Sequence, residues 1–259
     1  MIERIEHVMG MPVRVDIRDP DVDRTAVDDV FAWLRLVDAT FSTYRRHSEI
    51  SRLGRGELAR ADAHPHVRAL LDRCEELRVE TDGAFDVRAP LAGALDPSGL
   101  VKGWAIERAA ALLETAGAHR FLVDAGGDVT LRGGPWRVGI RHPHRRDRLA
   151  AVLTLRDGAV ATSGAYERGP HIVDPFTGRA ATGALSVTIV GPDLGTADAY
   201  ATAAFAMGER GPAWTATLRE YAAMTIAEGD RVLATPNFLR YCGGHSVADG
   251  LACARRAMV

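Results

Sequence analysis

The spacing of apolar residues changes along the chain, and this change constrains the fold more than any other feature of the sequence. Up to about residue 117, apolar residues recur at intervals of three and four, the period of a half-buried α-helix. Beyond that point, short apolar runs of strand length are separated by glycines. This mixture predicts an α+β fold whose strands pair mainly antiparallel.

The first half of the chain is expected to be mostly helical. Leu34, Val37 and Phe41 share one face of a helix, and Gly117 has the residue type favoured just past a helix C-terminus. A loop is expected over 81–103, where Gly, Pro and Asp are frequent. The expected elements are a single strand over 8–17 and helices over 26–41, 66–80 and 104–115.

The second half is expected to contain most of the strands. Asp157 and Gly158 form a turn typical of a hairpin between its two flanking strands. Thr196 has a residue type favoured at the N-cap of the Ala-rich helix that follows. The expected elements are strands over 120–123, 129–132, 136–140, 151–155, 159–161 and 185–190, helices over 196–207 and 213–221, and a final hairpin over 224–234.

The 259 residues show no repeat, low-complexity linker or clear boundary, so we expect one domain over 1–241 and leave the structure of 242–259 open. A net charge of -2 argues against a nucleic-acid surface. We expect no membrane span, because no apolar run reaches about 18 residues. Without a signal-peptide pattern at the start, the expected location is the cytoplasm.

Asp198 and Thr202 are four residues apart on the expected Ala-rich helix, so they share one face. Both supply oxygen, the ligand type that magnesium favours. The alternative is structural: an acid near a helix N-terminus is favoured by the helix dipole, and a threonine can bond back to a carbonyl.

Lys102 is the one lysine among 32 Lys and Arg residues. A position that keeps lysine in such a chain either needs a compact ammonium or has kept it by chance. Lys102 lies in the segment 96–103, whose glycines let a ligand approach the backbone ahead of a helix N-terminus. The segment does not match the phosphate-binding pattern GxxxxGK[ST].

Several motifs occur in the order found in the ApbE family, the FAD:protein FMN transferases, and the chain resembles that family over about residues 8–208. The matching segments are 9–10, 41–44, 48–51, 82–86, 96–103, 125–128, 162–164, 171–178 and 197–202. Two positions depart from the family pattern, Met11 after Met9-Gly10 and Pro97 after Asp96. Many members are exported lipoproteins, which this chain does not resemble at its start.

The resemblance implies an ApbE-type fold with FAD in a cleft and Mg²⁺, or Mn²⁺, at its diphosphate. The metal ligands would be the Gly99 carbonyl, Asp198 and Thr202, and His171 would lie near the metal and the reacting phosphate. The base that accepts the proton would be His171, whose ordinary pKa suits that task, with Asp174 and Asp86 as alternatives. The residues lining FAD would be Met9, Tyr44, Ala84, Phe85, Asp86, Asp96, Lys102 and Val173.

The implied activity is transfer of the FMN half of FAD to a threonine or serine hydroxyl of an acceptor flavoprotein, with release of AMP. Two alternatives remain open from the sequence. The same site could use water and split FAD into FMN and AMP, or the chain could bind flavin without catalysis.

Overall fold

A computed structural model describes the chain except for residues 90–93, 146, 166–168, 170 and 243–259. Its centre is one sheet in which every pair of neighbouring strands is antiparallel. In spatial order the strands are β1 (Ile2–Val8), β2 (Met11–Ile17), β3 (Phe121–Ala125), β4 (Asp128–Arg132), β7 (Gly158–Gly164), β10 (Ala184–Gly191), β11 (Ala222–Ala227) and β12 (Arg231–Ala234). The expected α+β class with antiparallel pairing is confirmed.

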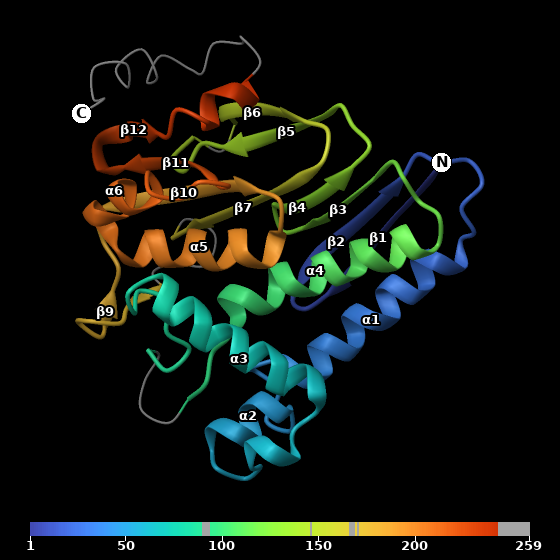
Figure 1. Cartoon of the computed structure of the whole chain (residues 1–259), viewed down its shortest axis with the longest axis horizontal. Coiled ribbons are helices and arrows are strands. Elements are labelled where there is room, and N and C mark those ends of the chain that lie inside the picture. The colour runs from blue at the N-terminus through green and yellow to red at the C-terminus, as the bar shows by residue number, and fades with distance from the viewer. Residues whose placement is uncertain (90–93, 146, 166–168, 170, 243–259) are drawn as a thin grey trace.

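Helices cover one face of this sheet, and a hairpin covers part of the other (Figure 1). The covering helices are α1 (Thr25–Phe41), α4 (Ser98–Thr115) and α5 (Leu194–Ala206), and α2 (Glu49–Gly54) and α3 (Pro65–Glu80) lie beyond them. The hairpin consists of β5 (Trp136–Arg141) and β6 (Leu149–Leu155). Smaller elements are α6 (Gly211–Thr215), the strands β8 (Val173–Asp174) and β9 (Arg179–Ala180), and four 3₁₀ turns, η1 (Arg60–Asp62), η2 (Gly208–Arg210), η3 (Glu228–Asp230) and η4 (Phe238–Cys242).

Burial along the strands follows this covering. Strand β11 lies where both faces are covered, and all six of its residues are buried. Strand β1 is at the edge of the sheet and alternates between half-buried and exposed residues. The apolar core therefore has two parts, one between the sheet and the helices and one beneath the β5–β6 hairpin.

The expected helices over 26–41 and 66–80 are confirmed within one residue at each end. Gly117 is also confirmed as the residue that ends α4, with a φ of 84°. The Ala118 N–H donates to the Leu113 carbonyl at 2.9 Å, and the Gly117 N–H donates to the Glu114 carbonyl at 3.0 Å. These two bonds satisfy carbonyls that the helix end would otherwise leave without a donor.

Three predictions need correction: the single strand over 8–17, the start of the helix expected at Trp104, and the hairpin expected at Asp157 and Gly158. The single strand over 8–17 is two strands, because Met9 and Gly10 form a turn with φ values of 56° and 76°. Helix α4 begins six residues before the expected Trp104, since the low helix propensity of Gly99 and Gly103 hides its first turns. Strands β6 and β7 form no hairpin: β6 pairs with β5, and β7 lies between β4 and β10.

Two helix predictions in the last part also need correction. Thr196 is not an N-cap; the side chain of Asp193 is, and its Oδ1 accepts a hydrogen bond from the Thr196 N–H at 2.7 Å. The helix expected over 213–221 is the short α6, which ends at Thr215. Except for Cys242, the tail 242–259 lies outside the described residues, and the single domain over 1–241 stays a prediction.

Candidate functional site

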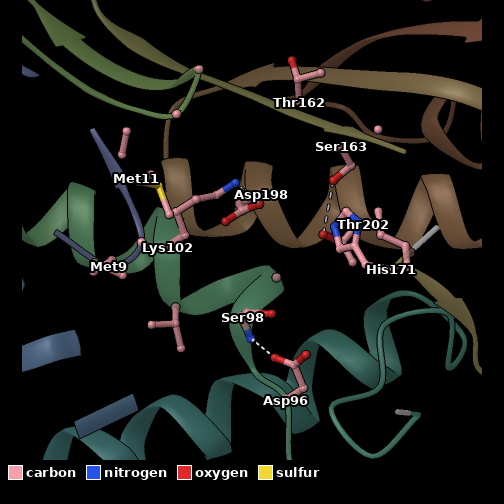
Figure 2. Close-up of a pocket in the computed structure, with 18 of the residues that line it drawn as sticks. Met9, Met11, Asp96, Ser98, Lys102, Thr162, Ser163, His171, Asp198 and Thr202 are labelled. Carbon is pink, nitrogen blue, oxygen red and sulfur yellow. Dashed lines mark hydrogen bonds and ion pairs between the residues drawn. The ribbon is translucent and has the colours of Figure 1, made fainter. Parts of the chain in front are cut away.

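A cavity of about 960 Å³ lies where the β1–β2 and β3–β4 turns meet the helices α4 and α5. This volume is near the upper end of the range for small-molecule sites, about 300–1,000 Å³, so a dinucleotide-sized ligand could enter. Every site residue predicted from the sequence lines this cavity, with the exception of Asp174. Figure 2 labels ten of the lining residues, which come from both the sheet and the helices.

Glycines bring α4 and α5 into close contact beside this cavity. A Cβ atom on Gly103 would lie 2.4 Å from the Leu194 carbonyl oxygen, closer than atoms can pack. A Cβ atom on Gly99 would lie 2.9 Å from Oγ1 of Thr202. Glycine at both positions lets α4 approach α5 closely, with Gly103 against Leu194 and Asp198 and Gly99 against Thr202.

The Gly103 N–H donates to Oδ2 of Asp198 at 3.1 Å. In a regular α-helix this N–H donates to the carbonyl four residues earlier, which here belongs to Gly99. Because Asp198 takes at least part of this donor, the Gly99 carbonyl oxygen retains acceptor capacity for another ligand. The α4–α5 contact therefore presents a carbonyl, a carboxylate and a hydroxyl, all oxygen ligands.

Asp198 belongs to a buried group of charges that also contains Lys102 and Asp128. Burial raises the pKa of Asp198 to about 7; the ammonium of Lys102 opposes this rise and the carboxylate of Asp128 adds to it. Nζ of Lys102 forms an ion pair with Oδ2 of Asp128 and lies 3.6 Å from Oδ1 of Asp198. The side chains of Asp128 and Asp198 are 1% and 3% exposed.

The sequence motif 125–128 contains Asp128, which was not among the predicted site residues. Its Oδ1 accepts a hydrogen bond from the Thr162 N–H at 2.9 Å, which ties it to strand β7. An acid placed directly after two glycines, at the start of a strand buried at four of its five positions, is the signal that could have identified it.

His171 lines the cavity, and its Nδ1 lies 2.9 Å from the Gly169 carbonyl oxygen. Because a carbonyl can only accept, Nδ1 carries the proton and Nε2 of the neutral ring has a lone pair. Asp174 differs: its Oδ1 accepts from the Phe176 N–H at 2.9 Å and its Oδ2 from the Thr177 hydroxyl at 3.0 Å. Its carboxylate thus organises the turn between β8 and β9.

The other predicted residues line the cavity in different surroundings. Ala84 and Phe85 are buried in its wall, whereas Tyr44 is 95% exposed. Oδ1 of Asp86 accepts from the Arg88 N–H at 2.8 Å, and Oδ1 of Asp96 accepts from the Ser98 N–H at 3.0 Å in the first turn of α4. Met9 lines the cavity from the β1–β2 turn and Val173 from strand β8.

Ser163 is a further lining residue that received no role from the sequence, although its motif was recognised. Its hydroxyl lies 3.3 Å from Oγ1 of Thr202, within hydrogen-bond distance. It therefore orients the Thr202 hydroxyl from the side of the sheet.

The described residues contain no group of three or more His, Cys, Asp and Glu side chains that could hold a metal ion. A divalent cation at the α4–α5 contact would therefore depend on carbonyl and hydroxyl oxygens beside a carboxylate. Such a set of hard oxygens matches Mg²⁺ or Mn²⁺ better than it matches zinc. In the part of the chain that the structure describes, no helix has the length and apolar character needed to cross a bilayer.

Two relatives with the same name are similar in sequence to this chain. A FAD:protein FMN transferase of Vibrio cholerae is 35% identical over 130 residues, covering 44% of this chain and 39% of that protein. A FAD:protein FMN transferase of Treponema pallidum is 36% identical over 168 residues, covering 53% of this chain and 46% of that protein. The aligned part of the chain thus spans less than half the length of these two relatives.

The solved structure of the flavin transferase ApbE from Vibrio cholerae has the same fold, with a TM-score of 0.82 at 23% identity over 93% of this chain and 98% of that one. The model of the ApbE family matches residues 9–92 and 89–225, well over half of the sequence. These matched ranges contain the whole α4–α5 contact and every predicted site residue. The chain belongs to the ApbE family.

Proposed function

We propose that this chain transfers the FMN half of FAD to a threonine or serine hydroxyl of an acceptor flavoprotein and releases AMP. The observation that carries this proposal is the α4–α5 contact, where an oxygen ligand set and His171 line one cavity of dinucleotide size. The names of the two relatives support the same reaction. The expected setting is the cytoplasm.

The proposed metal is Mg²⁺, with Mn²⁺ as a substitute, held by the Gly99 carbonyl, Asp198 and Thr202. Two observations support this assignment. The Gly103 N–H donates to Asp198, which leaves acceptor capacity on the Gly99 carbonyl, and Gly99 lies close to Thr202. When bound at the diphosphate, the ion would neutralise the charge that develops as the phosphate bond breaks.

The protein residues would bind and align the two reactants. Met9, Tyr44, Ala84, Phe85, Asp86, Asp96, Lys102 and Val173 would surround FAD. This alignment matters because phosphoryl transfer depends mainly on positioning and electrostatic stabilisation.

In the transfer step, the acceptor hydroxyl oxygen forms a bond to the phosphorus on the FMN side of the diphosphate. The bond from this phosphorus to the bridging oxygen breaks, and AMP leaves with the electron pair of that bond. The hydroxyl proton passes to a base, for which Nε2 of His171 has the free lone pair. Asp174 and Asp86 are the alternative bases, and of these two only Asp86 lines the cavity.

The test is incubation of the purified chain with FAD, Mg²⁺ and a candidate acceptor flavoprotein, followed by intact-protein mass spectrometry. The proposal expects the acceptor to gain the mass of one FMN in ester linkage and AMP to appear in equal amount. FMN and AMP without modified acceptor would instead identify an FAD hydrolase. FAD that binds and stays intact, in the presence of several acceptors, would identify a flavin-binding protein.

A further inference from the structure

The group formed by Lys102, Asp128 and Asp198 contains two carboxylates and one ammonium. Asp128 begins strand β4 and Asp198 lies on α5, and both pair with Lys102. Nζ of Lys102 is in ion-pair contact with Asp128 and 3.6 Å from Asp198, so the two acids compete for one cation. Figure 2 shows Lys102 extending from α4 toward Asp198.

Asp128 is the fixed partner in this competition. Asp128 is the first residue of strand β4, and its side chain is 1% exposed. The Thr162 N–H donates a hydrogen bond to its Oδ1 at 2.9 Å. Lys102 has a flexible four-carbon stem that can place its ammonium over a range of positions. The position of the ammonium is therefore set by Asp128.

Without Asp128, the ammonium would have Asp198 as its nearest carboxylate in this group. The attraction between two charges grows as their distance falls, and it grows further in a buried site. Lys102 would then move closer to the carboxylate that the proposed metal needs. The three charges would become two that cancel, and a divalent cation would no longer meet a negative site.

We infer that Asp128 is a positioning residue for the metal site: it holds the Lys102 ammonium and so leaves Asp198 available to a divalent cation. This inference rests on the proposed function, because it takes Asp198 as a metal ligand. It assigns Asp128 no contact with the metal or with FAD. Its effect on metal binding therefore passes entirely through Lys102.

The experiment measures Mn²⁺ binding to the purified protein at pH 8 without FAD, by isothermal titration calorimetry and by the electron paramagnetic resonance signal of free Mn²⁺. Asp128→Asn keeps the size of the side chain and an oxygen for the Thr162 N–H, and it removes the charge that holds Lys102. We expect Asp128→Asn to weaken Mn²⁺ binding at least tenfold.

The double variant Asp128→Asn/Lys102→Met separates positioning from a general structural role. It removes the ammonium that would otherwise cover Asp198, so we expect Mn²⁺ affinity to return to within about threefold of the wild-type value. A residue that merely stabilised the fold would give no such recovery. The matched control is Asp16→Asn, which removes a buried carboxylate on β2 that pairs with Arg14 and Arg18, and it should bind Mn²⁺ normally.

Lys102→Met alone keeps the idea testable if Asp128→Asn does not fold. Removal of the ammonium leaves both acids, so Mn²⁺ should bind severalfold more tightly than to the wild type. Wild-type Mn²⁺ affinity in Asp128→Asn, no recovery in the double variant, or unchanged affinity in Lys102→Met would each overturn the inference. Failure of the proposed metal site looks different: the wild type would bind no Mn²⁺, or Asp198→Ala would bind it normally.

Discussion

Asp16 on β2 and Asp128 on β4 are buried carboxylates of the same sheet, with opposite surroundings. Asp16 accepts hydrogen bonds from Arg14 at 2.8 Å and from Arg18 at 2.6 and 2.8 Å. The two arginine side chains are 40% and 41% exposed, and Arg14 also pairs with the exposed Glu3. Two carboxylates therefore meet two guanidinium groups in contact with solvent.

Asp128 belongs to a group in which two carboxylates meet one ammonium, and both acids are almost fully buried. The arginines around Asp16 are 40% and 41% exposed, so solvent screens their charges, whereas the Lys102 side chain that pairs with Asp128 is only 23% exposed. A balanced, exposed ion network contributes little beyond local stability. A buried group with one carboxylate in excess is costly, and it persists where a cation or ligand completes it.

The largest expected effect comes from removing the excess carboxylate. Asp198→Ala should abolish Mn²⁺ binding and FMN transfer. The melting temperature should not fall, because alanine is the best helix former and a buried acid is lost. Calorimetric Mn²⁺ titration, a transfer assay and differential scanning calorimetry measure the three quantities.

The control for this variant is Asp16→Asn, which should keep metal binding and transfer. Full turnover by folded Asp198→Ala would show that the contrast between the two carboxylates has no functional meaning.

The second effect tests whether the ammonium itself matters. Lys102→Arg keeps the charge, but a planar guanidinium is larger and prefers two-pronged contacts. We expect the rate of FMN transfer to fall about a hundredfold, the size that a 1 Å misplacement of reactants can cause. The melting temperature should stay nearly unchanged.

Steady-state kinetics with FAD and an acceptor protein decide this point. Wild-type rate constants in Lys102→Arg would mean that lysine was kept at this position by chance.

The sequence predicted the components of this site better than their arrangement. Asp198 and Thr202 could be paired because the helical period fixes which residues share a face. Ordered motifs identified most residues that line the cavity. The start of α4 could not be predicted, because Gly99 and Gly103 have low helix propensity and their value lies in close contact with α5.

The partner of Lys102 was also beyond sequence reasoning. Lys102 and Asp128 lie on a helix and a strand separated by the rest of α4 and by β3, and only the fold brings them together. The turn at Gly158 misled for the same reason: local turn chemistry does not determine which strands pair across the sheet.

A third effect follows from burial. Burial raises the pKa of Asp198 to about 7, so in the metal-free protein this group is protonated below that pH and ionised above it. A metal binds the ionised form and must displace the proton at lower pH. Mn²⁺ affinity should therefore be about tenfold weaker at pH 6 than at pH 8.

The raised pKa of Asp198 also makes the stability of the fold depend on pH. The raised pKa means that the metal-free fold loses stability as pH rises from the unfolded-state value toward 7. Added Mg²⁺ should then raise the melting temperature more at pH 8 than at pH 6. Asp16→Asn should show the same difference, and equal stabilisation at both pH values would contradict the prediction.

The smallest effect concerns Asp174, which the sequence named as a candidate base. Like Asp16, Asp174 has both carboxylate oxygens engaged by donors, the Phe176 N–H and the Thr177 hydroxyl. Asparagine can still accept from the Phe176 N–H, so Asp174→Asn should loosen the β8–β9 turn only slightly. We expect the transfer rate to stay within about threefold of wild type, because a general base contributes far more, about 10²–10⁴-fold.

His171→Gln is the matched comparison, because it removes the lone pair at Nε2 and keeps a polar side chain. If His171 is the base, its variant should lose about a hundredfold or more in rate, whereas Asp174→Asn should not. The reverse result, a large loss in Asp174→Asn with a nearly silent His171→Gln, would move the base to β8. It would also show that a carboxylate with both oxygens occupied in the free protein can release its donors when the substrates bind.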